Sequence, residues 1–137
     1  MIKQKDVVRM KVPFPSISDK MAVYSHMYIC YNQSGTVYEY IKCQTLKPYM
    51  LINNPMLHYH DEYPDIHRNP FTQVTRIDFD KVFKTTTVHY NDGLKTSSRP
   101  DVCDELFNSV HLELNKDGYY KILINEIEIK KLNSLIN

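Results

Sequence analysis

The stretches Ser25-His-Met-Tyr-Ile-Cys-Tyr31 and Val37-Tyr-Glu-Tyr-Ile-Lys-Cys-Gln-Thr-Leu46 decide the fold of this chain. Both are runs of aromatic and β-branched residues, which suit the pleated, half-buried surface of a strand. Between them, Asn32-Gln-Ser-Gly35 supplies the Asn and Gly that turns favour. The sequence therefore predicts a β-hairpin, with strands over Ala22–Tyr31 and Val37–Leu46.

Strand patterns also lie on both sides of this hairpin. Val7–Val12 is a mostly apolar run that stops at Pro13, where a proline removes a ladder donor. Val74–Phe83 alternates, so Arg76 and Asp78 should point to one face of a strand and the apolar residues between them to the other. Residues 85–90 could extend this sheet. We expect these segments to form one mostly antiparallel sheet.

Helix signals are confined to the C-terminal part. Ser97–Asp101 combines hydroxyls, a proline and an acidic residue, as helix starts do, and predicts a helix to about Leu114. Asn115–Gly118 supplies its end. A short strand over Tyr120–Ile124 and a helix over Asn125–Leu135 should follow.

Residues 47–73 carry four prolines and show no clean period, so we expect a long loop there. Loops of this length are usually functional or disordered. Its mixed charges and low apolar content predict that it is mobile in the free protein and gains order with a partner.

Length and composition fit a single domain over residues 1–137. Hydrophobic residues make up 42% of the chain and charged residues 24%, as in an ordinary globular protein. A net charge of +1 disfavours binding of long duplexes, so any contact with nucleic acid must come from a local cluster of cations. Only three scattered glycines are present, which argues against a glycine-rich phosphate loop and a nucleotide cofactor.

The three cysteines are odd in number and lack C-x-x-C spacing. With no signal-peptide core and no membrane-length apolar run, we expect a cytoplasmic protein with reduced thiols and no membrane partner. Cys30 and Cys43 lie among apolar strand residues, where a buried structural thiol is the favoured interpretation over a nucleophile.

The first 47 residues resemble the MazF/PemK toxins, a family of endoribonucleases from toxin–antitoxin systems. Asp6-Val-Val followed by Pro13-Phe14 is similar to the family's G-D-[IV]-V strand and Pro-Phe loop, and Cys43-Gln-Thr45 to its Cys-Pro-[IV]-Thr-Ser segment. His26-Met27 stands where the family has Arg-Pro. The resemblance implies an α+β fold: a small, curved, SH3-like β-barrel with helices packed at its C-terminal part. It also implies a homodimer, an antitoxin partner and metal-independent cleavage of single-stranded RNA without a cofactor.

The resemblance points to four catalytic residues: His26, Thr45, Arg76 and Asp78. Attack of a ribose 2′-hydroxyl on its own phosphate needs a base, a cation for the developing charge and an acid for the leaving oxygen. His26 would be base or acid, Arg76 the cation, Asp78 an orienting or proton-donating group, and Thr45 a phosphate contact. A second register, in which Asp80-Lys-Val82 matches the family's Asp-Gln-[IV], would place Asp78 at the family's arginine position. Alternatively, these side chains are ordinary polar residues of a solvated strand.

Further candidate sites lie outside that group. Lys47 and the pair His67-Arg68 are candidate RNA contacts, since Arg forks onto phosphate oxygens. The loop 58–68, with three His and three carboxylates, could hold zinc or manganese, but it fits no fixed metal framework, and a polar loop that orders on a partner is the favoured interpretation. We therefore assign no metal.

The hairpin tyrosines, among them Tyr38 and Tyr40, could stack RNA bases or could be partly buried sheet residues. A rival function is a catalytically degenerate barrel that serves a phage or mobile element as a protein- or RNA-binding module. Fold alone cannot choose between the two functions.

Overall fold

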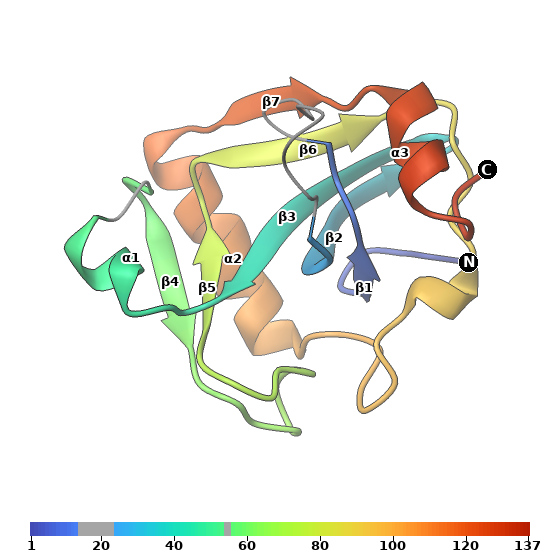
Figure 1. The fold of residues 1–137 in the computed structure, drawn as a ribbon. Helices are drawn as coiled ribbons and strands as arrows, with labels where there is room; N and C mark the ends of the chain where they lie inside the picture. The colour runs from blue at the N-terminus through green and yellow to red at the C-terminus, as the bar shows by residue number, and fades with distance from the viewer. Residues whose placement is uncertain (14–23, 54–55) are drawn as a thin grey trace.

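The computed structural model describes residues 1–13, 24–53 and 56–137 (Figure 1). Strands dominate this part of the chain, which confirms the mostly β class. The strands are β1 Val7–Met10, β2 His26–Ser34, β3 Val37–Thr45, β4 Tyr59–Glu62, β5 Thr75–Asp78, β6 Lys81–Thr85 and β7 Tyr120–Leu123. The helices are α1 Tyr49–Ile52, α2 Asp104–Asp117 and α3 Glu126–Leu132, with a 3-10 turn, η1, at Asp92–Leu94.

The predicted hairpin and its neighbouring strand are confirmed. β1 pairs with β2 and β2 with β3, all antiparallel. Residues 22 and 23, where the second strand was expected to begin, lie outside the described residues, and β2 extends beyond Tyr31 to Ser34. Gly35 makes the turn with φ of +59°, a conformation that a residue without Cβ adopts readily.

The centre of the sheet is β3, which pairs with β2 along one edge and with two short strands along the other. Near its C-terminal end Thr45 lies opposite Thr75 of β5, and near its N-terminal end Tyr38 lies opposite Thr85 of β6. β4 continues the sheet beyond β5, and β7 runs parallel to β6 (Figure 1). The prediction of one continuous strand over Val74–Phe83 was therefore wrong, because two strands, β5 and β6, occupy this segment. Asp78 Oδ1 accepts a hydrogen bond from the Asp80 amide at 2.7 Å, and this local turn separates β5 from β6.

The sheet does not close into a barrel within the described residues. Its main path runs β1-β2-β3-β5-β4, and no ladder in this part of the chain joins the outer strands β1 and β4. The outer edge of β1 instead meets the segment 95–101, where the Val7 amide donates to the Pro100 carbonyl at 2.8 Å. The expected SH3-like closure is thus not seen here.

Residues 47–73 are more structured than the sequence predicted. α1 and β4 both lie in this segment, and β4 is hydrogen-bonded to β5 with His60 opposite Ile77. Four residues whose burial does not alternate cannot be distinguished from a loop by their pattern, so pairing with β5 determines this strand.

The long helix begins later than its signals suggested. Cys103 caps α2, its Sγ accepting from the Leu106 amide at 3.4 Å. The expected start, residues 97–101, is bent, non-helical backbone beside β1, where the Thr96 amide also donates to the Val7 carbonyl at 3.0 Å. The helix then continues past Leu114 to Asp117 and ends at Gly118, whose φ is +78°.

Each face of the sheet has its own core. One cluster joins Tyr28, Tyr40 and Phe83 to the C-terminal segment, including Ile129 of α3. The other packs Ile29, Ile41 and Ile77 against Leu106, Val110 and Leu114 of α2. The last strand and α3 lie close to their predicted positions, with Asn125 capping α3. None of the helices described is long and apolar enough to cross a membrane.

Tyr38, Tyr40 and the two cysteines of the hairpin belong to these cores. Tyr38 and Tyr40 are at most 5% exposed and stack on each other with ring centroids 5.9 Å apart. This burial confirms the interpretation as sheet residues and leaves their rings out of reach of RNA bases. Cys30 and Cys43 are buried free thiols, and burial raises the pKa of Cys30 to about 12. Neither thiol is suited to act as a nucleophile.

Candidate functional site

His26 is the first residue of β2 and lies opposite Met10 of β1. Its side chain is half-buried, and it shares a neighbourhood with two cations, Arg9 and Lys42. Burial, followed by repulsion from Lys42 and Arg9, lowers the pKa of His26 from 6.5 to about 4. The imidazole is therefore neutral at neutral pH and able to accept a proton.

Thr45 and His26 line the same cavity. It is small, about 60 Å³, and opens at the ends of β2 and β3. The other lining residues are mostly polar: Arg9, Ser25, Met27, Cys43, Phe71, Thr72, Gln73 and Thr75. A neutral histidine, a guanidinium and several hydroxyls around one small cavity suit an oxyanion such as phosphate.

Arg76 is placed elsewhere, and its guanidinium is already occupied. It pairs with Gln44 across the sheet, so it faces away from the side of Thr45 and Thr75. Its side chain is 2% exposed, donates to both carboxylate oxygens of Asp61 at 2.7 and 2.8 Å, and lies over the Tyr59 ring at 3.8 Å. The Arg76 side chain therefore holds β4 against β5 in this structure.

Asp78 lies on the same face as Arg76, as the alternation predicted. It is fully buried, and its carboxylate accepts hydrogen bonds from Lys81 Nζ and from the Asp80 amide. The four proposed catalytic residues thus form two pairs: His26 with Thr45 at the cavity, and Arg76 with Asp78 inside the sheet. Their catalytic roles stay predictions.

The three proposed RNA contacts are also separated. Lys47 is exposed just after β3. His67 is exposed in the turn before Arg68, and its backbone amide donates a hydrogen bond to the Asp65 carboxylate. Arg68 donates to Glu62 at 3.0 Å and lies 3.1 Å from Glu105 of α2. Lys47 and His67 are accessible, whereas Arg68 ties β4 to α2.

Two of the three histidines of the 58–67 segment have side chains that are each engaged with a different carboxylate. His58 Nδ1 lies 3.2 Å from Asp80, and His60 Nε2 lies 3.0 Å from Glu62. Over the described ranges, no group of three or more His, Cys, Asp or Glu side chains could hold a metal ion together. The metal alternative for this loop gains no support from the geometry.

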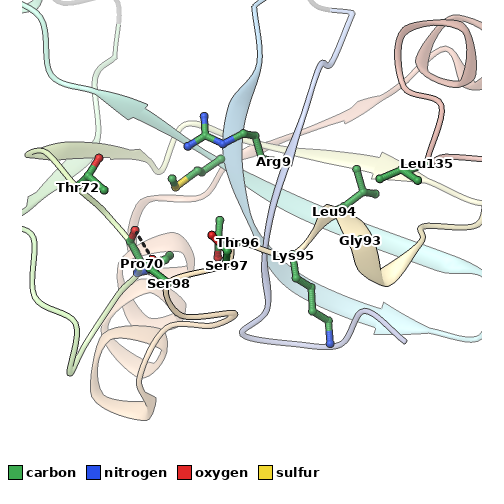
Figure 2. A pocket seen from close by; sticks show the side chains of 11 residues that line it. Arg9, Pro70, Thr72, Gly93, Leu94, Lys95, Thr96, Ser97, Ser98 and Leu135 are labelled. Atoms are coloured by element: carbon green, nitrogen blue, oxygen red, sulfur yellow. Dashed lines mark hydrogen bonds between the residues drawn. The ribbon is translucent and has the colours of Figure 1, made fainter.

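Arg9 is a lining residue of the small cavity that was not predicted from the sequence. It is the exposed position of β1 in an otherwise buried strand, which was a readable signal: a charged residue inside Val-Val-Arg-Met. Arg9, Met27 and Thr72 line both the small cavity and a larger one beside it, of about 440 Å³. Figure 2 shows the Arg9 side chain extending from β1 toward the end lined by Thr72, with Leu94 and Leu135 at the other end.

The sequence matches no protein-family model, and comparisons with curated proteins and with solved structures found no match.

Proposed function

We propose that this chain is a toxin-like endoribonuclease that cleaves single-stranded RNA without a metal, at the small cavity lined by His26 and Thr45. The observation that supports this most is that His26, whose imidazole is neutral, and Thr45, nineteen residues further along the sequence, both line one small polar cavity. Both belong to the set that the family resemblance singles out.

The chemistry is transfer of a phosphodiester to the neighbouring 2′-oxygen. His26 takes the proton of the ribose 2′-hydroxyl as the oxygen attacks the adjacent phosphorus, and the bond from phosphorus to the 5′-oxygen breaks. The leaving oxygen takes a proton from water, and the RNA is left with a 2′,3′-cyclic phosphate and a 5′-hydroxyl. The Thr45 hydroxyl donates to a phosphate oxygen, where negative charge develops.

The remaining expectations from the resemblance are part of this proposal. We treat the open sheet as a variant of the SH3-like barrel of MazF/PemK toxins, and we expect a homodimer that is held inactive by an antitoxin in the cytoplasm. Lys47 and His67, both exposed, are the outer RNA contacts in this scheme.

The test is cleavage of an end-labelled, single-stranded RNA by the purified protein in the presence of a chelator. We expect cyclic-phosphate ends, and no cleavage when a 2′-deoxy nucleotide replaces the one at the cut. His26→Gln should lower the rate about a hundredfold or more, a typical loss for a general base. His89→Gln, a change at an exposed histidine far from the cavity in sequence, serves as the control and should leave the rate unchanged.

The pH dependence provides a second readout. Because the pKa of His26 is lowered to about 4, kcat/KM should hold on the acid side down to about pH 4 and fall only as the imidazole becomes protonated below it. Full activity in His26→Gln would remove His26 from the mechanism.

A binding module without catalysis is the second candidate. It is favoured by the ion pairs of Arg76 with Asp61 and of Asp78 with Lys81. These pairs occupy the cation and the carboxylate that the RNA-cleavage chemistry of the family would use. In that case no RNA would be cut in any buffer, while RNA or protein binding would persist.

A further inference from the structure

We propose that Arg9 is the phosphate-binding cation of the RNA site and that the larger cavity beside it holds the nucleoside next to that phosphate. The assignment of RNA as ligand rests on the function proposed above. Arg9 takes the role for which the sequence had suggested Arg76.

The charge of Arg9 is available to a ligand. Arg68, Arg76 and Arg99 are each paired with a carboxylate at 2.7 to 3.0 Å. Arg9 is exposed and has no carboxylate partner among the residues that the structure describes. An arginine without a protein partner can fork onto two oxygens of one phosphate.

Arg9 also lies in the right position on the sheet. Arg9 lies opposite Met27, Met27 opposite Cys43, and Thr45 is two residues further along β3, so Arg9 and Thr45 share one face of the sheet. Arg9 also lines both cavities. A phosphate bound to Arg9 therefore lies between the His26–Thr45 cavity and the larger one.

The lining of the larger cavity suits a nucleoside. Its apolar walls come from Met27, Pro70, Leu94 and Leu135, which suit the flat faces of an unstacked base. Thr72 and Ser97 add hydroxyls, while Lys95 points away from the other lining residues (Figure 2) and is near Asp6 at 3.4 Å. A volume of about 440 Å³ is in the range of small-molecule sites and accepts one nucleoside of a single strand.

The experiment measures binding of a single-stranded oligonucleotide with 2′-O-methyl riboses, which lack the attacking hydroxyl and cannot be cut by the proposed reaction. Arg9→Ala should weaken its binding about 10- to 100-fold, the effect of one charge-assisted contact. The slope of log Kd against log salt should fall by about 0.7, as expected for one lost phosphate contact to a single strand. Lys116→Ala removes an exposed charge at the end of α2 and should change neither quantity. Equal binding by Arg9→Ala and the wild type would overturn the proposal.

Two substitutions of opposite charge at the same position test the larger cavity. Ser97 is exposed at its rim and can accept a longer side chain. Ser97→Glu should weaken binding of the same oligonucleotide and Ser97→Lys should strengthen it, whereas Ser134→Glu, at an exposed residue outside the cavity, should have no effect. Identical affinities for the two Ser97 variants would exclude the cavity from the binding site.

The outcomes separate this inference from the proposed function. Binding that depends on Arg9 without any cleavage of natural RNA would support the inference and refute the nuclease. Cleavage that depends on His26 but not on Arg9 would support the nuclease and refute the inference. Absence of any oligonucleotide binding by the wild type would refute both.

Discussion

The Arg76 guanidinium is bound on several sides at once. Asp61 accepts two of its hydrogen bonds, the Met50 carbonyl of α1 accepts a third at 3.3 Å, and the Tyr59 ring lies beneath its central carbon. The Asp61 carboxylate also raises the pKa of Arg76, so the charge is permanent. At the scale of this residue, the geometry supports a structural role.

We therefore predict that Arg76→Ala destabilises the fold. Loss of the forked ion pair and its packing should cost about 2 kcal/mol or more in the free energy of unfolding, measured by urea denaturation. Lys131→Ala, which breaks an exposed pair with Glu128, should cost less than about 1 kcal/mol. If Arg76→Ala were as stable as the wild type and yet inactive on RNA, Arg76 would have the catalytic role that the sequence suggested.

At the scale of elements, α3 is attached to the turn after β6 by one carboxylate. Glu126, in the first turn of α3, accepts hydrogen bonds from the backbone amides and hydroxyls of both Thr86 and Thr87. Burial opposes ionisation of this group, but the hydrogen bonds from Thr87 and Thr86 outweigh it and lower the pKa of Glu126 from 4.5 to about 2.

This contact should make stability depend on pH in a defined window. Because the pKa is lower in the folded state, the contribution of Glu126 is complete above about pH 4.5 and is lost as pH falls toward about 2. Glu126→Gln should therefore unfold at a lower urea concentration at neutral pH and show a shallower loss of stability between these two values. Glu128→Gln is the matched control on the same helix. A pH profile that is unchanged in Glu126→Gln would show that the contact contributes nothing.

At the scale of the whole molecule, β3 is the central strand of the sheet, because β2, β5 and β6 all pair with it. Ile41 lies at its centre, fully buried between β2 and the α2 side of the core. The two faces of the sheet should consequently unfold together.

We predict that Ile41→Ala lowers the free energy of unfolding by about 2–5 kcal/mol and preserves one cooperative transition. Leu123→Ala on β7, where the side chain is 73% exposed, should change the free energy of unfolding by no more than about 0.5 kcal/mol. Circular dichroism and tyrosine fluorescence should give coincident curves. Two separate transitions would mean that the two cores fold as independent units.

Local patterns of the sequence were sufficient for much of the fold. The alternation around β2 and β3, the Asn-Gly turn region and the capping Asn125 are properties of neighbouring residues, and these elements lie close to where they were predicted. The same alternation placed Arg76 and Asp78 on one face. Burial of the thiols likewise followed from their apolar neighbours.

Only the tertiary structure decided what these side chains meet. Arg76 is bound by Asp61, fifteen residues earlier, because β4 forms at the sheet edge out of a segment that looks like a loop. The helix start moved to Cys103 because the preceding residues are hydrogen-bonded to β1 in non-helical backbone. Arg9 joins Thr45 because strand register aligns them through Met27 and Cys43. Periodicity records which side of a strand faces the core, whereas ion pairs and cavities depend on the register between distant strands, which the sequence does not display locally.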